Sequence, residues 1–141
     1  MIKDFVKAWD ANKMRLCDHI ASTKHSNYSN YEDIVKMLFE QVINPYLVEN
    51  DLTPYNVENL HEIDDGDYQG TLLYIIPKQT YQPSYYEYVA TYVYYGSCSG
   101  CDTLQGIQDY SLGLPNNEQI KEYLDLCLDI LQQCKYPFGI E

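Results

Sequence analysis

Basic residues are scarce in this sequence. Only nine residues are Lys or Arg, with Arg15 the single arginine, against 21 Asp and Glu, so the formal net charge is -12. Proteins hold nucleic acid mainly through Lys and Arg contacts to its phosphates. We therefore expect no direct nucleic-acid binding and no attraction to anionic membranes. A charged partner is expected to be a protein with a basic surface.

Long apolar runs are also lacking. No stretch approaches the roughly 20 apolar residues that a membrane-spanning helix needs. The opening residues, 1–5, are amphipathic and do not begin the apolar core of a signal peptide. The sequence therefore predicts a cytoplasmic protein without a membrane anchor.

Motifs of catalysis are missing as well. The sequence contains no Gly-rich phosphate loop, no His-Glu-x-x-His and no nucleophile elbow. His19, His25 and His61 are isolated from one another, and each is interpreted as a solvated or core histidine. Asp64, Asp65 and Asp67 lack the later ligands of a calcium loop and are interpreted as part of a turn. A non-enzymatic protein is the resulting hypothesis.

The length and the apolar content are those of one globular domain. The chain has 141 residues, of which 45% are hydrophobic, so one core over residues 1–141 is expected. Residues 2–21 carry apolar side chains at helical spacing, and a second helix is predicted to begin at a capping box, Ser29 with Glu32, and to end at Pro45.

Three strands are predicted next, over residues 56–63, 68–76 and 86–95. The first two are expected to join through a tight Asp-Gly hairpin at 64–67, with positive φ at the turn. A short helix capped by Asp102 and a last helix capped by Asn116 with Gln119 follow. The order ααβββαα predicts a single α+β domain with a small antiparallel sheet packed against helices.

Sixteen tyrosines are unusual for this length. Because side chains alternate along a strand, the third strand is predicted to carry tyrosines on one face and smaller residues on the other. The tyrosine face comprises Tyr86, Tyr88, Tyr92 and Tyr94, and the opposite face comprises Val89, Thr91 and Val93. The favoured interpretation is an aromatic core beneath the helices. The alternative is an exposed surface for a partner or for a second copy of the chain.

Five cysteines make no disulfide framework, and two of them, Cys98 and Cys101, form a Cys-x-x-Cys between a strand and a short helix. A structural corner allowed by Gly96 and Gly100 is the favoured interpretation. In a redox interpretation the helix amides would stabilise a thiolate, which the neighbouring Asp102 would oppose.

A zinc interpretation stays open for the same pair. Cys98 and Cys101 would supply two ligands at suitable spacing, and a site needs two more. The remaining candidates are Cys17, His19, Cys127 and Cys134. No cofactor is expected, and zinc is the alternative.

Four runs of the sequence resemble uncharacterised small bacteriophage and prophage proteins. The most specific is Tyr-Tyr-Gly-Ser-Cys-Ser-Gly-Cys-Asp-Thr-Leu-Gln at 94–105, and the others lie at 42–46, 64–71 and 114–119. The resemblance covers most of the chain and marks a family without marking an activity. It implies a phage-type protein, and the cysteines at 17, 127 and 134 do not belong to its pattern.

The leading hypothesis combines this resemblance with the acidic composition. A phage-type accessory protein would bind and inhibit a basic host protein, for example a defence nuclease such as a CRISPR effector, with carboxylates in place of phosphates. The alternatives are a small zinc-binding or thiol-redox protein using Cys98 and Cys101, and a virion or assembly component. The candidate contact residues are Asp64, Asp65, Asp67, Tyr86, Tyr88, Tyr92, Tyr94, Glu118, Glu122 and Asp125.

Overall fold

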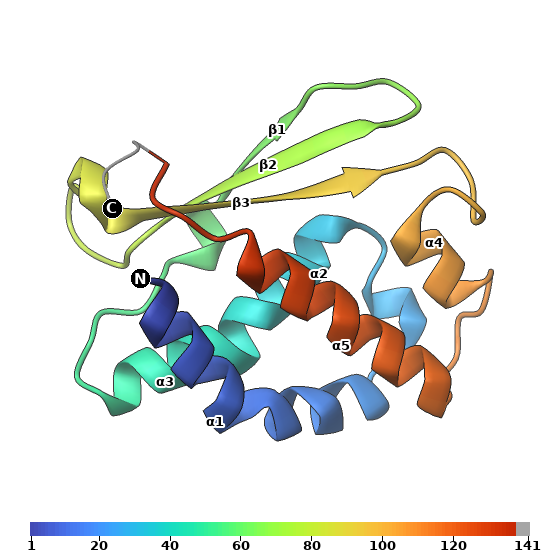
Figure 1. Cartoon of the computed structure of the whole chain (residues 1–141), viewed down its shortest axis with the longest axis horizontal. Helices are drawn as coiled ribbons and strands as arrows, with labels where there is room; N and C mark the ends of the chain where they lie inside the picture. The colour runs from blue at the N-terminus through green and yellow to red at the C-terminus, as the bar shows by residue number, and fades with distance from the viewer. Residues whose placement is uncertain (138–141) are drawn as a thin grey trace.

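The computed structural model describes residues 1–137, and it confirms the predicted α+β class with a three-stranded antiparallel sheet (Figure 1). The helices and strands follow the predicted order, with one further helix, Asn44–Glu49, before the sheet. They are α1 (Ile2–Ala21), α2 (Tyr31–Leu38), α3 (Asn44–Glu49), β1 (His61–Asp64), β2 (Gly70–Pro77), β3 (Tyr88–Tyr95), α4 (Thr103–Gln108) and α5 (Asn117–Gln132).

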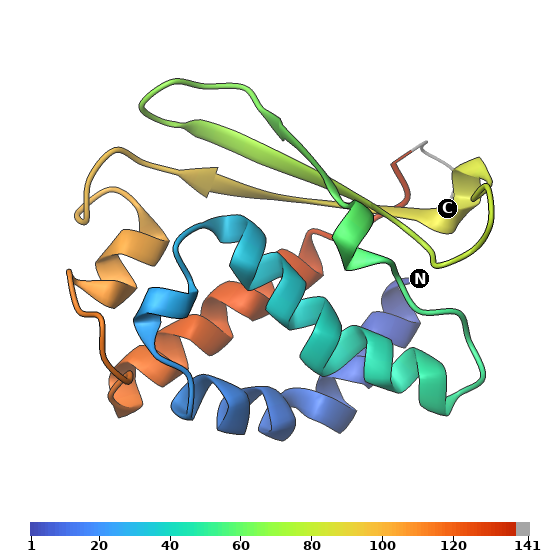
Figure 2. The ribbon, with the colours of Figure 1, turned by 180° about the vertical axis from the view of Figure 1, so that it is seen from behind.

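The sheet forms one layer, and the helices lie on one side of it (Figures 1 and 2). Helices α2 and α5 lie next to the sheet, and α1 packs against α5 on the side away from the strands. The strand order is β1-β2-β3, so β3 is an edge strand. Thr91 of β3 fixes the edge to α5, because its hydroxyl donates a 2.7 Å hydrogen bond to the carbonyl of Ile130.

The tyrosine face of β3 is turned away from the helices. Val89 and Val93 are buried toward α5, whereas Tyr94, on the other face, is 68% exposed. In the part of the chain that the structure describes, no helix covers that outer face (Figures 1 and 2). The expectation of an aromatic core there is wrong, because the smaller valines fill the space against α5. Tyr86 lies outside the strand, in a 3-10 turn over Tyr85–Glu87.

Pro45 does not end the second helix, contrary to prediction. A π-helical turn over Phe39–Ile43 joins α2 to α3, and the amide of Asn44 donates to the carbonyl of Phe39 five residues earlier. Pro45 then lies in the first turn of α3, where a missing amide is tolerated. The predicted cap is also displaced by one residue, because Asn30 accepts from the amide of Asp33 at 3.1 Å.

The first hairpin differs from the prediction in length and turn type. A 3-10 turn occupies Val57–Asn59, so β1 begins only at His61, and Tyr68 lies in the loop before β2. Gly66 does not adopt positive φ. It is needed for close approach, because a Cβ there would lie 2.1 Å from the Gln69 carbonyl oxygen.

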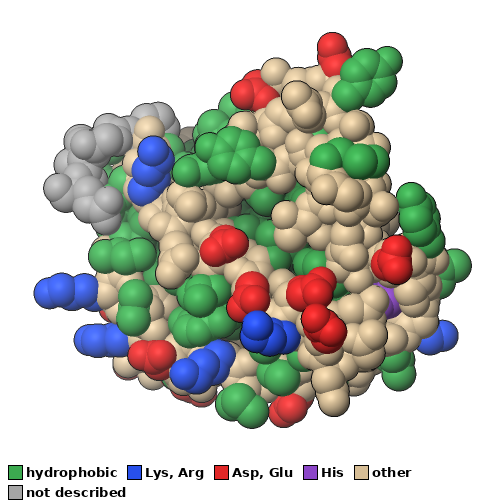
Figure 3. All heavy atoms as spheres, turned by 45° about the vertical axis from the view of Figure 1, so that its right-hand side comes forward, with side chains coloured by type: hydrophobic (Ala, Val, Ile, Leu, Met, Phe, Trp, Pro, Cys, Tyr) green, Lys and Arg blue, Asp and Glu red, His purple; other side chains and the backbone are tan. Residues whose placement is uncertain are grey.

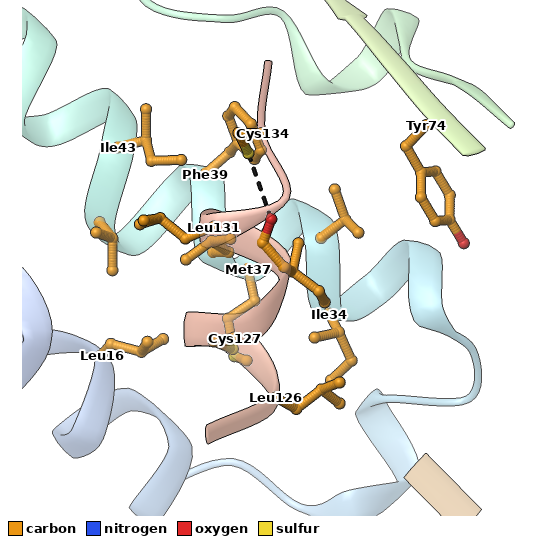
Figure 4. Close-up of a cluster of buried hydrophobic side chains, with 14 of the residues drawn as sticks. Leu16, Ile34, Met37, Phe39, Ile43, Tyr74, Leu126, Cys127, Leu131 and Cys134 are labelled. Carbon is orange, nitrogen blue, oxygen red and sulfur yellow. Dashed lines mark hydrogen bonds between the residues drawn. The ribbon is translucent and has the colours of Figure 1, made fainter. Parts of the chain in front are cut away.

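Helices α1, α2 and α5 meet in a buried cluster with the π-helical turn (Figure 4). Leu16, Phe39, Cys127 and Leu131 are each almost completely buried. Within residues 1–137, no helix has the length and apolar character that crossing a membrane requires.

Candidate functional site

The connection from β3 to α4, residues 96–102, forms the centre of the candidate site, and we call it the cysteine turn. Asp102 holds both of its ends. One carboxylate oxygen accepts from the amide of Gly96 at 2.8 Å, and the other caps α4 by accepting from the amide of Gln105 at 2.9 Å. Asp102 is only 5% exposed, so the turn is built around a buried carboxylate.

Tight packing inside the turn explains Gly96. A Cβ at this position would lie 2.3 Å from the carbonyl oxygen of Cys101, so any side chain would push the turn open. Gly100 is under no such constraint, because a Cβ there would meet nothing within 4 Å. The tight corner therefore requires glycine at position 96 and does not require it at position 100.

The two sulfur atoms of the cysteine turn lie side by side. Cys98 Sγ and Cys101 Sγ are 2.7 Å apart, and the amide of Cys98 donates to Cys101 Sγ at 2.9 Å. The pKa of the Cys101 thiol is lowered chiefly by the hydrogen bond from the Cys98 side chain, with smaller contributions from Ser97 and the backbone amides. Both cysteines are exposed. A thiolate on Cys101 therefore has donors around it and is open to solvent.

The expected opposition from Asp102 is absent. Its carboxylate is bonded to two backbone amides and is not among the groups that shift the pKa of Cys101. Asp102 is adjacent to Cys101 in the sequence, but the direction of its carboxylate depends on the fold of the turn and is not indicated by that adjacency.

Two of the three additional cysteines that a zinc site could recruit are in the core, and the third, Cys17, is half-buried on α1. Burial raises the pKa values of Cys127 and Cys134 to about 12, and Figure 4 shows both among apolar side chains. Cys134 Sγ lies 3.5 Å from the Ile130 carbonyl oxygen. Across residues 1–137, no group of three or more His, Cys, Asp or Glu side chains is placed to hold a metal ion.

A groove of ≈ 470 Å³ runs between the cysteine turn with α4 and the helix α5. Three of its carboxylates come from α5, at Glu122, Asp125 and Asp129, and we call it the acidic groove. None of these three residues forms an ion pair within residues 1–137. Figure 3 shows Asp and Glu side chains gathered near the middle of one face, with a basic side chain directly beside them and other basic side chains toward the edges. The lining residues are Ser99, Gly100, Cys101, Asp102, Thr103, Gly106, Ile107, Glu122, Asp125, Leu126 and Asp129.

The outer edge of β3 continues this surface. Ala90 exchanges two backbone hydrogen bonds with Lys135, at 2.8 and 2.9 Å, on the side away from β2. Because outward-facing backbone groups alternate along a strand, those of Tyr92 and Tyr94 face the same side. They have no hydrogen-bond partner in residues 1–137. A pocket of ≈ 300 Å³ at this edge is lined by Tyr92 and Tyr94 and shares Asp129 with the acidic groove.

The structure brings only some of the predicted contact residues together. Glu122 and Asp125 line the acidic groove, and Tyr92 and Tyr94 line the pocket beside it. The other six candidates line neither: Asp64, Asp65, Asp67, Tyr86, Tyr88 and Glu118.

The hairpin carboxylates have structural roles instead. Tyr95 Oη donates to Asp64 at 2.6 Å, which lowers the pKa of Asp64, and Asp65 accepts from the amide of Thr71 at 2.6 Å. Sequence reasoning missed Asp129. Its spacing of four residues from Asp125 and seven from Glu122 was the available signal, because it places the three on one helix face.

Comparison with known proteins adds no further assignment. The chain matches no protein-family model, no curated protein and no solved structure. The acidic groove, the strand edge and the thiol pair are therefore the features that bear on function.

Proposed function

We propose that this protein binds a basic segment of another protein, which lies in the acidic groove and pairs with the open edge of β3. The observation that carries the proposal is the pair of outward backbone positions, Tyr92 and Tyr94, next to the carboxylate of Asp129. An extended segment added to a sheet edge satisfies such backbone groups. Lys or Arg side chains on the segment would then reach the acidic groove.

The charges of the groove favour a cationic occupant. Glu122, Asp125 and Asp129 repel one another and form no ion pair in the described chain. A basic segment relieves that repulsion and is steered toward the groove before contact. Exposed charges are screened over a Debye length of about 10 Å at 0.1 M salt, so binding should weaken as salt increases.

Two tyrosine rings at the edge of β3 would add aromatic contact area to the proposed binding surface. The rings of Tyr92 and Tyr94 lie 5.6 Å apart in an edge-to-face arrangement. Tyrosines are enriched at interface positions that contribute most of the binding energy. The two rings would pack against the apolar parts of the bound segment.

The class of partner follows from the resemblance to phage proteins. For a phage-type accessory protein, the partner is a basic host protein, and a defence nuclease such as a CRISPR effector is one example. Carboxylates spaced along α5 would occupy positions that nucleic-acid phosphates otherwise take. The protein would act by binding and inhibiting, without chemistry of its own in this role.

A labelled peptide of alternating Lys and Val tests the charge of the groove by fluorescence anisotropy. We expect the triple variant E122Q/D125N/D129N to bind at least about tenfold more weakly at low salt, within the range of electrostatic effects on association. The matched control is E40Q/E49Q/E58Q, which removes the same charge from three exposed residues that do not line the groove. Equal loss in both variants would mean that only net charge matters, and would contradict the proposal.

The strand edge is tested separately with Tyr94→Pro against Tyr94→Ala. Both remove the ring, and only proline removes the outward amide, which β2 does not use. We expect the proline variant to bind the peptide more weakly than the alanine variant. Equal binding by the two would rule out strand addition while leaving the charge test unaffected.

A further inference from the structure

We infer that Cys98 and Cys101 form a thiol–disulfide exchange site, in which Cys101 attacks a disulfide carried on a basic segment and Cys98 resolves the mixed disulfide. The exchange reaction stands on the geometry of the cysteine turn. The preference for a basic segment rests on the proposed function.

The arrangement of donors distinguishes the two cysteines. Cys101 Sγ accepts from the Cys98 amide at 2.9 Å, lies 2.7 Å from the Cys98 thiol, and has the Ser97 hydroxyl 3.7 Å away. The Cys98 amide, the Cys98 thiol and the Ser97 hydroxyl can stabilise negative charge on Cys101 once its thiol, which otherwise donates to the Cys98 carbonyl oxygen at 3.3 Å, has lost its proton. Because the thiolate is the nucleophile in exchange, Cys101 is the attacking residue.

The distance between the sulfurs suits the second step. A disulfide bond is about 2.05 Å long, so Cys98 Sγ and Cys101 Sγ must approach by only a small movement from 2.7 Å. Both thiols are exposed, so a substrate sulfur can reach them. The buried Asp102 and the close contact at Gly96 hold the turn in this geometry.

The reaction balances without any further reagent. The Cys101 thiolate attacks one sulfur of the substrate disulfide, forms a mixed disulfide and releases the other substrate sulfur as a thiolate, which takes up a proton. Cys98 then loses its proton and attacks Cys101 Sγ, which forms the Cys98–Cys101 disulfide and releases the second substrate thiol. Two electrons pass from the protein dithiol to the substrate disulfide.

The acidic groove determines which disulfides are favoured. Cys101 lines the same groove as Glu122, Asp125 and Asp129. A disulfide flanked by Lys or Arg is attracted to these carboxylates, whereas an anionic disulfide such as glutathione disulfide is repelled. The substrate class is therefore a disulfide on a basic protein or peptide segment.

Three small disulfides of different charge test the exchange and the preference separately. The reduced protein is mixed with neutral hydroxyethyl disulfide, cationic cystamine or anionic dithiodiglycolate, and the products are followed by mass spectrometry. We expect the wild type to form the internal disulfide with the neutral reagent and to retain no adduct. Cys98→Ser should retain an adduct on Cys101, and Cys101→Ser should react much more slowly.

The charge preference is measured as a ratio of rates. We expect cystamine to react about tenfold faster than dithiodiglycolate at low salt, an effect within the range of electrostatic steering. The ratio should fall toward one in E122Q/D125N/D129N and remain in E40Q/E49Q/E58Q. Exchange with equal rates for all three reagents would overturn the basic-substrate assignment and leave the exchange site intact.

Two results would overturn the exchange site itself. One is wild-type protein that forms no Cys98–Cys101 disulfide with the neutral reagent. The other is purified protein that carries one zinc ion per chain, lost in Cys98→Ser, because a metal-bound pair is not a free dithiol. Failure of peptide binding with normal exchange would instead contradict only the proposed function.

Discussion

At the scale of single residues, two cysteine environments in this protein have opposite effects on the thiol. Burial among apolar side chains raises the pKa of Cys127 to about 12. Hydrogen bonds lower the pKa of Cys101, which is exposed. The sequence around the two cysteines does not indicate this difference in pKa, because it depends on which donors the fold brings near each sulfur.

Replacing Cys98 with Ala should raise the pKa of Cys101, because the Cys98 thiol is the largest cause of its lowering. A lowered pKa means that the thiolate persists to lower pH, so the wild type should react faster near neutral pH. We expect the midpoint of the pH dependence of the rate of alkylation by iodoacetamide to lie at a higher pH in the variant than in the wild type. The measurement uses a Cys17→Ser background in both proteins to remove the half-buried thiol of α1. An unchanged midpoint would contradict the assigned hydrogen bond.

Asp102 should matter for stability more than any exposed carboxylate. Asp102→Ala leaves the amides of Gly96 and Gln105 without their acceptors and removes the cap of α4. The expected loss is about 1–3 kcal/mol in the free energy of unfolding, measured by urea denaturation. Asp67→Ala, at an exposed position in the hairpin loop, is the control and should change little. Equal effects would show that the buried carboxylate does not hold the turn.

At the scale of elements, the caps of α4 and α5 were predictable from the sequence, whereas the cap of α2 lies one residue later than predicted. Asn116 and Gln119 form the predicted reciprocal cap of α5, at 2.8 and 2.9 Å. Pro45 was misread because its effect depends on the π-helical turn before it, which no local pattern indicates. Sequence reasoning therefore succeeded for the caps of α4 and α5 and failed where the backbone register had to change.

Asn116→Ala should destabilise the protein by about 1 kcal/mol, because the alanine side chain cannot accept from the Gln119 amide. Asn117→Ala, one residue later, removes no cap and is the matched control. Chemical denaturation of both variants checks the difference. A loss in Asn117→Ala as large as that in Asn116→Ala would contradict the capping role.

Strand alternation predicted the two faces of β3 but not which face the helices would cover. That choice depends on α5, which lies more than 20 residues later in the chain. The acidic groove was unpredictable for the same reason, since α4, α5 and the cysteine turn form it together. The helical spacing of Glu122, Asp125 and Asp129 could be recognised in the sequence. The groove that these residues line with the cysteine turn and α4 could not.

At the scale of the whole molecule, negative charge is poorly compensated. Twenty-one carboxylates and a net charge of -12 accompany just two ion pairs in the described residues, Lys13 with Asp10 and Lys36 with Glu32. Self-repulsion of this kind opposes the compact state. Under the proposed function, the carboxylates of the acidic groove would favour partner binding and reduce stability.

The opposition of these two effects predicts that E122Q/D125N/D129N is more stable than the wild type while it binds the basic peptide more weakly. Neutral amides remove repulsion along α5 and leave no buried group unpaired, because Glu122, Asp125 and Asp129 make no internal hydrogen bond or ion pair in residues 1–137. A gain of about 1 kcal/mol would raise the melting temperature by roughly 2–8 °C at low salt. Added salt should raise the wild-type melting temperature toward that of the variant, because screening removes the same repulsion. A variant that melts lower than the wild type at low salt would show that these carboxylates support the fold, and would leave no stability cost for binding to offset.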